Sequence, residues 1–556
     1  MTVADYIAEF LVSKGVKHVF GFQGSAMLKM LDAIMATGKI EYVQNFNEQA
    51  SAFAADAYAR VSGGIGVAIA TSGPGAANLI AGIANAYFDS VPALFITGQD
   101  YTSSIAANNG ARQNGFQDMD IVSMVKPITK YAVLIDDPQR VRYELEKAYF
   151  IATNGRKGSV LIDVPIDIQF KEVDCGHLEG FHPPGQDKFD LKIGEIAKAL
   201  NASTRPLILA GGGIRGADAV AEFRSFVKAT GIPVVSTLAG LDATPDTVGF
   251  AGIFGNSEAR LASLNADLML VLGARFSRQH TGKKREEFSN PRAKIIHVDI
   301  DKTEINRTFM KEDISVVADL KEFLTTIGSV DFNLEIKPWK NQIRKWKEQY
   351  GDRIRCNSTG IDPVDVVKAV VEHLADNSVV TADVGANQMW TAQALRIKEK
   401  QRLLNSAGFG AMGYSLPAAF AVSYLAPAVC FTGDGGLQMN LQELNTIGLR
   451  KANVKCFVFN NNSLGLMLSA QKKYYSNHFY GNTEKEFTCP NLEKLADAFN
   501  LNYFKVETQS DINDVGKVFE DNLPCLVDVV LDRNCDVLNR YNDLPVGGGG
   551  GYFKIL

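Results

Sequence analysis

The sequence predicts an α/β protein made of three doubly wound parallel-sheet domains. Short β-branched runs bounded by Gly, Asp or Pro alternate with longer helical patterns along all 556 residues, and this alternation is typical of parallel sheets covered by helices. A chain of this length is also too long for one hydrophobic core. Its composition, 46% apolar and 21% charged residues, is that of an ordinary globular protein.

The strand-like runs fall into three groups, and each group holds enough strands for one open sheet. Before residue 170 stand "KHVFGF", "GVAIATSG", "ALFITGQ" and "SVLIDVP". Between residues 206 and 301 stand "PLILAGGG", "PVVSTLAG", "LMLVLGAR" and "KIIHVDID". After residue 377 stand "SVVTADVGA", "AVCFTGDGG", "KCFVFNNN" and "CLVDVVLD". The first and third groups are similar in layout.

Two segments separate these groups. Residues 175–190 are polar and rich in Gly and Pro, which favours a linker. Residues 337–363 form a charged helical connector that ends in a turn. We therefore expect domains at 1–175, 188–335 and 355–556.

Composition excludes several classes of function. The sequence has no window of about 18 uninterrupted apolar residues, so we expect no membrane span, and without a visible signal peptide we expect a cytoplasmic protein. The net charge is −5 and Lys/Arg blocks are lacking, which argues against nucleic acid as a partner. The seven cysteines are scattered without a CxxC pair, so we expect neither disulfides nor structural zinc.

The stretch "FTGDGG", followed later by "FNNN", can be a phosphate loop, a metal site or only two turns. A Walker A loop is a poor interpretation, because no Lys and Ser/Thr follow the second Gly. Asp434 stands between Gly433 and Gly435, and its carboxylate and the later asparagine oxygens are hard ligands suited to Mg²⁺ or Ca²⁺ shared with a phosphate. Alone, either half favours the plain alternative of a turn or a helix cap.

The distance in sequence between the Gly-Asp-Gly turn and the asparagine run favours a metal site over two unrelated turns. The 24 residues 436–459 suffice for one helix and one strand of a parallel βαβ unit, which brings both halves to one edge of a sheet. This pattern resembles the signature of thiamine diphosphate-dependent enzymes. The resemblance implies that Asp434 and Asn461 bind Mg²⁺ through their side chains and that a backbone carbonyl near Ser463 completes the protein ligands.

Glu48 stands in "NFNEQASAFAADAYAR", at the start of an Ala-rich helical pattern. A lone Glu there is usually a carboxylate that complements the helix dipole. This segment, however, resembles the "NEQ" helix start in the acetolactate synthase group of these enzymes. The resemblance implies that Glu48 hydrogen-bonds the aminopyrimidine of the cofactor and promotes formation of the ylid, in a desolvated setting that raises the affinity of a carboxyl for its proton.

The resemblance to the acetolactate synthase-like branch extends over almost the whole chain. It rests on "GFQGSAMLKMLDAI", "ATSGPGAANLIAGIANAYFDSVPALFITGQ", "RQNGFQDMDIVSMVKPITKYA" and "GFGAMGYSLPAAFA". It implies a pyrimidine-binding first domain, a central nucleotide-type domain and a diphosphate-binding third domain. It further implies an active site between the first domain of one subunit and the third domain of another, hence a homodimer or homotetramer.

The same resemblance implies roles for individual residues. Beside Glu48, the catalytic positions are Gly24, Phe116 and Gln117. The positions that bind thiamine diphosphate are Ala26, Pro74, Asn78, Ala386, Asn387, Gln388, Gly410, Met412, Gly433, Gly435, Gly436, Met439, Gly465 and Leu466. For Phe116, Met412 and Met439, plain core packing is the competing interpretation.

The resemblance implies FAD in the central domain. This chain has "AGGG", "STLAG", "GIFG" and "GARFSRQHTG" where the family has its flavin-binding segments. The implied residues are Gly212, Gly213, Thr237, Leu238, Gly273, Arg275, Asp299 and Asp319. Phe254 stands where the family has His, and Gln279 where it has Arg, so an altered or vestigial nucleotide pocket is the competing interpretation.

Two departures concern the substrates. Ile166 stands at a family lysine, and Ala470 stands at a family tryptophan that narrows the acceptor pocket. We expect a 2-keto acid donor, most simply pyruvate, and a carbonyl acceptor. The acceptor can be a second pyruvate, a keto-sugar nucleotide or another large ketone. Plain decarboxylation, hydrolysis of a diketone and a catalytically silent homologue remain alternatives.

The C-terminal stretch "RYNDLPVGGGGGYFKIL" contains five consecutive glycines, residues 547–551, which favour a flexible joint. A frayed end is the common case for a terminus. The alternative is a lid over the active site that carries Tyr552 and Phe553.

Overall fold

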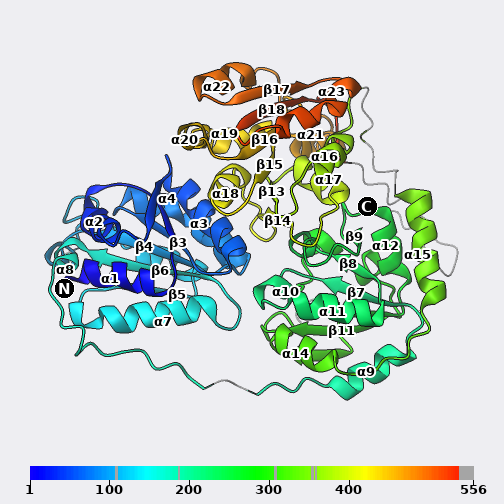
Figure 1. Cartoon of the computed structure of the whole chain (residues 1–556), viewed down its shortest axis with the longest axis horizontal. Coiled ribbons are helices and arrows are strands. Elements are labelled where there is room, and N and C mark those ends of the chain that lie inside the picture. The colour runs from blue at the N-terminus through cyan, green and yellow to red at the C-terminus, as the bar shows by residue number, and fades with distance from the viewer. Residues whose placement is uncertain (107–109, 186–187, 306–309, 352–355, 357–359, 538–556) are drawn as a thin grey trace.

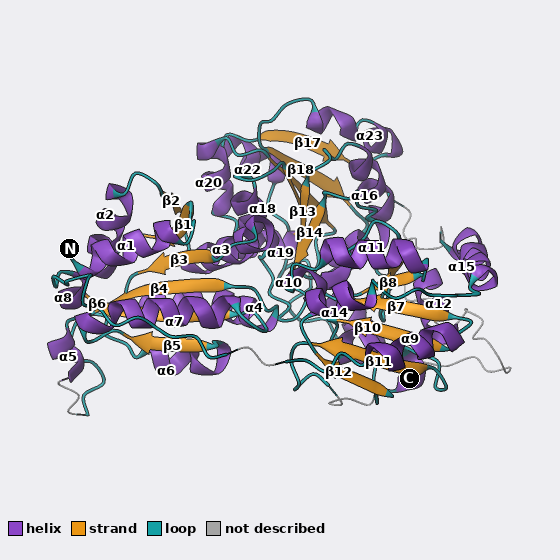
Figure 2. Ribbon diagram, turned by 60° about the horizontal axis from the view of Figure 1, so that its bottom comes forward, coloured by secondary structure: helices purple, strands orange, loops and turns teal. Residues whose placement is uncertain are grey.

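A computed structural model describes the chain except residues 107–109, 186–187, 306–309, 352–355, 357–359 and 538–556 (Figure 1). Within the described residues the strands form three six-stranded parallel sheets, one in each third of the chain. Helices cover the faces of these sheets (Figure 2). The predicted α/β class with three parallel-sheet domains is therefore confirmed. The C-terminal glycines, Tyr552 and Phe553 lie outside the described residues.

The first sheet has the strand order β2-β1-β3-β4-β6-β5. Its strands are β1 (His18–Phe22), β2 (Glu41–Gln44), β3 (Gly66–Ala70), β4 (Ala93–Gln99), β5 (Tyr131–Leu134) and β6 (Ser159–Pro165). Its helices are α1 (Val3–Ser13), α2 (Leu28–Ala36), α3 (Glu48–Ser62), α4 (Pro74–Phe88), α5 (Thr102–Ala106), α6 (Ile121–Val125), α7 (Val141–Thr153) and α8 (Ile166–Gln169).

The second sheet has the order β12-β11-β10-β7-β8-β9. Its strands are β7 (Pro206–Ala210), β8 (Val234–Ser236), β9 (Thr247–Phe250), β10 (Leu268–Leu272), β11 (Lys294–Asp299) and β12 (Ile314–Val317). Its helices are α9 (Ile193–Ala202), α10 (Gly213–Gly216), α11 (Val220–Thr230), α12 (Ser257–Asn265), α13 (Arg278–Thr281) and α14 (Leu320–Ile327). The helix α15 (Lys337–Tyr350) forms the connector to the third sheet. Numbered within this domain, the strand order is that of the dinucleotide-binding fold.

The third sheet has the order β14-β13-β15-β16-β18-β17. Its strands are β13 (Val379–Ala382), β14 (Arg402–Asn405), β15 (Ala428–Gly433), β16 (Val454–Asn460), β17 (Asn502–Val506) and β18 (Cys525–Val530). Its helices are α16 (Pro363–Glu372), α17 (Ala386–Ala394), α18 (Ser415–Val422), α19 (Asp434–Met439), α20 (Glu443–Arg450), α21 (Gly465–Tyr474), α22 (Leu492–Ala498) and α23 (Gln509–Asn513). Relative to its own numbering this order repeats that of the first sheet.

Central strands of the sheets are buried on both faces. Every residue of β4, β6 and β16 is buried, as expected for parallel strands between two helical layers. Between the first and third domains, α3 packs against α18. A buried polar network ties this contact together, because Asp56 accepts hydrogen bonds from Arg60 (2.8 Å) and from Tyr414 (2.9 Å).

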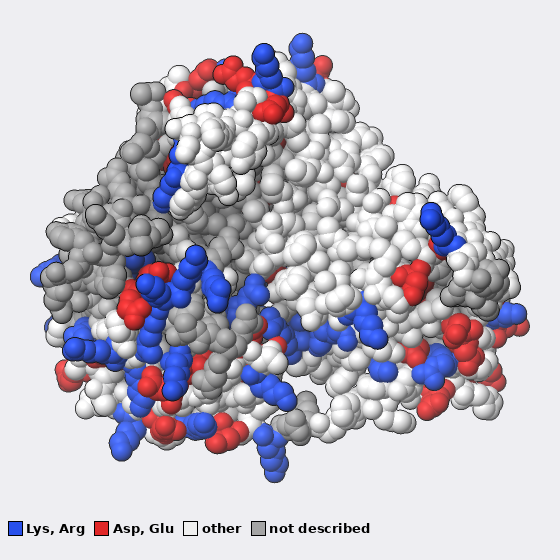
Figure 3. All heavy atoms as spheres, turned by 180° about the vertical axis from the view of Figure 1, so that it is seen from behind, with Lys and Arg blue, Asp and Glu red and all other residues white. Residues whose placement is uncertain are grey.

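Charged side chains are unevenly distributed over the surface. Seen from behind, they gather over the lower part of the molecule and at its upper rim, whereas a broad area of the middle carries few of them (Figure 3). Within the described residues, no helix combines the length and apolar character that crossing a bilayer requires.

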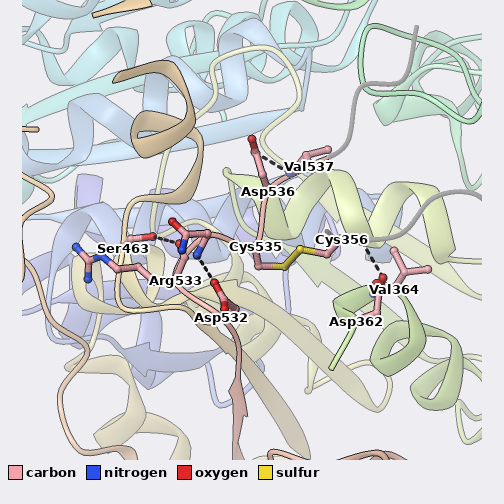
Figure 4. Close-up of a disulfide and its surroundings, with 10 residues drawn as sticks. Cys356, Asp362, Val364, Ser463, Asp532, Arg533, Cys535, Asp536 and Val537 are labelled. Atoms are coloured by element: carbon pink, nitrogen blue, oxygen red, sulfur yellow. Dashed lines mark hydrogen bonds between the residues drawn. A yellow bond between two sulfur atoms is a disulfide. The ribbon is translucent and has the colours of Figure 1, made fainter. Parts of the chain in front are cut away.

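The expectation that the chain has no disulfide is wrong. Cys356, just before α16, is joined to Cys535, just after β18, with their Cα atoms 5.6 Å apart (Figure 4). The two cysteines are 179 residues apart in the sequence, so no local spacing pattern could reveal the pair. The other five cysteines are free.

Candidate active site

The carboxyl ends of β15 and β16 lie side by side, since Gly433 pairs with Phe459 in neighbouring parallel strands. Asp434 opens α19 at the end of β15, and Asn461 and Ser463 follow β16. The backbone N–H of Ser463 donates to Asp434 Oδ2 (3.2 Å) and points to Asn461 Oδ1 (3.3 Å). The three residues predicted to bind a metal therefore meet at one point, and all three are buried.

The chemistry of this point suits a hard cation. Burial raises the pKa of Asp434 to about 7, against the opposing effect of hydrogen bonds from Gly435 and Ser463. In the described part of the chain, no group of three or more His, Cys, Asp or Glu side chains is arranged to hold a metal ion by itself. One carboxylate with amide and carbonyl oxygens is a ligand set that Mg²⁺ accepts when a phosphate supplies further oxygens.

Three helices begin around the same point. α17, α19 and α21 start at the carboxyl ends of β13, β15 and β16, so their first N–H groups are available to an anion. Asn387 Oδ1 and Gln388 Nε2 are buried at the start of α17, and neither has a hydrogen-bond partner among the described residues. Gly465 lies beside Asn461 and Ala386. This cradle of free donors and acceptors fits a diphosphate.

Close packing explains the glycines of this loop. A Cβ at Gly436 would lie 2.8 Å from Asp383 Oδ1, and one at Gly435 would lie 2.5 Å from Leu464 Cδ2 and 3.2 Å from Met412 Cε. Gly410 adopts a φ of +74° in the loop that leads to the half-buried Met412. Leu466 is half-buried, and Met439 is 54% exposed. Core packing is therefore not the role of Met439.

A second group of predicted residues surrounds Glu48 in the first domain. Glu48 begins α3, is 7% exposed, and accepts a hydrogen bond from Asn78 Nδ2 (3.0 Å). A Cβ at Gly75 would lie 3.2 Å from Glu48 Oε1 and 2.8 Å from Thr71 Cγ2. Thr71 also contacts the β1–α2 loop. It accepts a hydrogen bond from the N–H of Ala26 (3.2 Å) and leaves no room for a side chain at Gly24.

Gln117 and Phe116 approach the same group from a separate loop. Gln117 has a φ of +62° and packs against Gly73, the residue before Pro74 at the start of α4. Phe116 is 79% exposed. Core packing is therefore excluded for Phe116, and its ring is free to contact another molecule.

Comparison with known proteins agrees with this arrangement. Models of the "Thiamine pyrophosphate enzyme" family match residues 1–124 (N-terminal TPP binding domain), 193–327 (central domain) and 383–529 (C-terminal TPP binding domain). An acetolactate synthase large subunit of Porphyra purpurea is 34% identical over 570 residues, covering 98% of this chain and 93% of the relative. A probable acetolactate synthase large subunit of Methanocaldococcus jannaschii is 35% identical, with coverages of 96% and 92%.

The chain belongs to the thiamine pyrophosphate enzyme family. The group around Asp434 lies in the C-terminal TPP binding domain, and the group around Glu48 lies in the N-terminal one. The contacts of Asp434 and Glu48 described above each stay within one domain. Besides the α3–α18 contact, the two domains are joined where Asn45 Nδ2 and the N–H of Phe46 donate to the buried Glu443 (2.8 and 2.9 Å).

In this thiamine pyrophosphate enzyme a further cavity opens at the carboxyl ends of β7, β8, β10 and β11. It encloses about 990 Å³ of space, including its open mouth. The predicted nucleotide-binding residues that line it are Gly212, Gly213, Thr237, Gly273, Arg275, Asp299 and Asp319. Leu238 lies in the adjoining hydrophobic core instead, and Ala239 takes its place in the wall.

Sequence reasoning missed the part of this cavity that other domains supply. Asp89, Arg156 and Lys157 of the first domain and Ala407 and Gly408 of the third line it as well. Asp89 fixes the third domain here, because its carboxylate accepts from the N–H groups of Ala407 (3.0 Å) and Gly408 (2.6 Å). These segments are far apart in the sequence and carry no local motif that could have revealed them.

Proposed function

We propose that this protein uses thiamine diphosphate and Mg²⁺ to decarboxylate a 2-keto acid, most simply pyruvate, and to ligate the two-carbon unit to a carbonyl acceptor. The observation that carries the proposal is the convergence of Asp434, Asn461 and Ser463 on one buried point. The names of the acetolactate synthase relatives support the same reaction class.

The residues of the chain have distinct tasks in this proposal. Asp434 and Asn461 hold Mg²⁺ by their side-chain oxygens, and the free N–H groups of α17 and α21 bind the diphosphate. Glu48, oriented by Asn78, holds a proton at the pyrimidine nitrogen. Thiamine diphosphate itself supplies the carbanion chemistry when bound. Phe116 and Gln117 face the substrate.

We further propose that the active site is completed by a second copy of the chain. Glu48 and Asp434 lie in separate domains, and the half-sites expose large apolar side chains such as Phe116 and Met439. The charge-poor area of the surface in Figure 3 favours a subunit interface, since the cores of interfaces are depleted of charged residues. A homodimer is the smallest unit that meets this requirement.

The central cavity supports FAD as a second cofactor. The strand order of the dinucleotide-binding fold places its switch point at β7 and β10, whose ends contribute Gly212, Gly213 and Arg275 to the cavity. Protein loaded with FAD and then desalted is expected to keep the flavin absorbance bands. A spectrum without flavin bands overturns this assignment and favours the altered nucleotide pocket.

An acceptor larger than pyruvate is the second candidate. Ala470 is a small, half-buried residue of α21, the helix that starts beside the proposed metal ligands, and Ile166 begins α8 without a charge. The small side chain at position 470 favours a wider acceptor pocket. A keto-sugar nucleotide or another large ketone fits such a pocket, whereas plain decarboxylation or diketone hydrolysis needs no acceptor.

Product analysis tests the proposal. Holoenzyme is incubated with ¹³C-labelled pyruvate, first alone and then with added ketones, and products are identified by mass spectrometry. Acetolactate from pyruvate alone supports the simplest reaction, and a labelled adduct only with a large ketone supports the second candidate. Absence of CO₂ release from a panel of 2-keto acids, in enzyme shown to bind thiamine diphosphate, overturns both and favours a catalytically silent homologue.

A further inference from the structure

The disulfide between Cys356 and Cys535 lies next to the proposed metal site (Figure 4). The segment 531–537, which follows β18 and contains Cys535, is called the support segment below. The loop 460–464, which contains the proposed ligands Asn461 and Ser463, is called the metal loop. The disulfide joins the support segment to Cys356, at the end of the connector between the second and third domains.

The support segment holds the metal loop from the side opposite to Asp434. The N–H of Leu531 donates to the carbonyl of Asn460 (2.9 Å). The guanidinium of Arg533 donates to the carbonyl of Asn462 (2.5 Å), and the hydroxyl of Ser463 reaches the carbonyl of Arg533 (3.5 Å). The position of the metal loop therefore depends on where the support segment lies.

The support segment also positions α21, which begins directly after the metal loop. Ser469 Oγ donates to Asp536 Oδ2 (2.5 Å), and Lys472 Nζ donates to Asn534 Oδ1 (2.6 Å). Both contacts flank Cys535 in the sequence. Ser469 lies in the middle of α21 and Lys472 in its last turn, so a displacement of Cys535 would shift the helix whose N-terminus is proposed to bind the diphosphate.

At its other end the disulfide is anchored to the framework of the third domain. The N–H of Cys356 donates to Asp362 Oδ2 (2.8 Å), and Asp362 caps α16 through the N–H of Val364 (2.9 Å). Cys535 is 2% exposed within the hydrophobic core of this domain, whereas Cys356 is half-buried at its edge. The bond therefore ties the support segment to a rigid helix, and its sulfur on Cys356 is the one that solvent thiols can approach.

We propose that the Cys356–Cys535 disulfide is a redox-sensitive crosslink that sets the affinity of the metal loop for Mg²⁺ and the cofactor diphosphate. A low-molecular-weight thiol reduces this disulfide, and the corresponding small-molecule disulfide reoxidises it. A thiolate attacks the sulfur of Cys356, the S–S bond breaks, and Cys535 leaves as a thiolate. A second thiol then releases Cys356, so two electrons and two protons pass from two thiols, which end as one disulfide. This inference rests on the proposed function.

The test uses the full-length wild-type protein, freed of thiamine diphosphate and equilibrated with mixtures of reduced and oxidised glutathione. Peptide mapping by mass spectrometry follows the 356–535 crosslink, and calorimetry gives the Kd of thiamine diphosphate at saturating Mg²⁺. The oxidised protein is expected to bind thiamine diphosphate at least about fivefold more tightly, the lower end of typical coupling between two sites. Cys356→Ser is expected to bind like the reduced wild type in both mixtures.

Cys489→Ser is the matched control. Cys489 also contacts the metal loop, because its N–H donates to Asn462 Oδ1 (2.9 Å), but its thiol is free. This variant is expected to keep the full redox dependence. A redox dependence that disappears with Cys489 and persists in Cys356→Ser overturns the proposal.

Hydrogen exchange distinguishes failure of the redox proposal for the disulfide from failure of the proposed function. On reduction, faster exchange is expected at the metal loop and the support segment, with or without cofactor. The redox proposal is overturned if the crosslink never forms, or if the oxidised and reduced proteins have the same Kd and the same exchange rates. If neither state binds thiamine diphosphate, the proposed function fails, and exchange rates alone decide whether the disulfide controls the metal loop.

Discussion

The first and third sheets share one strand order, yet their carboxyl ends carry different groups. In both domains the third strand in sequence, β3 or β15, leads into a glycine-containing turn and a helix. In the third domain this turn presents Asp434 beside an amide and three helix N-termini. In the first domain the helix after the corresponding turn presents Asn78 to the carboxylate of Glu48. Topology fixes where loops meet, and their side chains decide what is bound.

The two half-sites also differ in the surroundings of their buried carboxylates, Asp434 and Glu48. Asp434 lies among backbone N–H groups and polar oxygens, a setting that a cation and a phosphate complete. Glu48 begins a helix whose next turns are mostly Ala, and Asn78 is the side chain that hydrogen-bonds it. This contrast between the two half-sites favours the proposal that the third domain binds the metal and diphosphate and that the first domain handles the proton. Variants in each half should then fail in different ways.

The largest effect is expected from Asp434→Ala in the third domain. The variant loses the carboxylate proposed to bind Mg²⁺, so binding of Mg²⁺ and thiamine diphosphate and the rate of CO₂ release should fall together. A metal contact worth several kcal/mol corresponds to at least about 10³-fold in rate. Calorimetry and a decarboxylation assay measure the two losses. Asp497→Ala, an exposed site in the same domain, is the control and should change neither.

Glu48→Gln in the first domain should separate binding from chemistry. The amide keeps the size of the side chain but cannot exchange the proton, so CO₂ release should fall by about 10²–10³-fold. The Kd of thiamine diphosphate should change little, because the residues proposed to bind the metal and the diphosphate lie in the other half. Glu9→Gln, an exposed carboxylate on α1, controls for the loss of charge. An undiminished rate would remove Glu48 from the mechanism.

The sequence-based prediction of strands succeeded in the middle of each sheet and failed at its edges. The predicted runs correspond to strands inside the sheets, such as β4 and β16, which are apolar because both faces are buried. The strands that were missed are the edge strands β2, β5, β9, β12, β14 and β17. The edge strand β2 buries only one of its four residues, and its sequence EYVQ begins and ends with a polar residue, so it lacks a continuous apolar run.

The candidate site was predictable where one local segment carries it. The spaced Asp434 and Asn461 belong to a single βαβ unit, so their meeting follows from connectivity. The central cavity combines Arg156 and Gly408 with the second domain, and the Cys356–Cys535 pair spans 179 residues. The cavity depends on how whole domains pack, and the disulfide depends on how the two ends of the third domain meet. Periodicity and spacing encode neither.

Cation binding in the third domain should depend on pH through the carboxyl group of Asp434. Burial raises the pKa of Asp434 to about 7 in the metal-free protein. Below that pH a cation must displace a proton, so the affinity for Mn²⁺ should rise about tenfold per pH unit up to pH 7 and then level off. Electron paramagnetic resonance of free Mn²⁺, recorded without thiamine diphosphate, measures it. An affinity independent of pH would contradict the raised pKa.

As pH rises, the stability of the metal-free protein should fall, whereas its affinity for Mn²⁺ should rise. An unfolded Asp titrates near pH 4, so between about pH 4 and 7 the folded state binds more protons at Asp434 than the unfolded state does. The free energy of unfolding should therefore fall as pH rises through this window. Asp434→Asn has no such carboxyl and should lack that part of the slope in urea titrations.

The smallest effect, and the one that tests the two halves together, comes from mixing Glu48→Gln and Asp434→Ala subunits. If each site takes its carboxylate from one subunit and its metal loop from the other, a mixed dimer has one intact site and one doubly damaged site. Random mixing makes about half of the dimers mixed, with one of two sites working, so activity should reach about a quarter of wild type. If each site belongs to one subunit, every site in the mixture stays damaged and activity stays at the level of the parents.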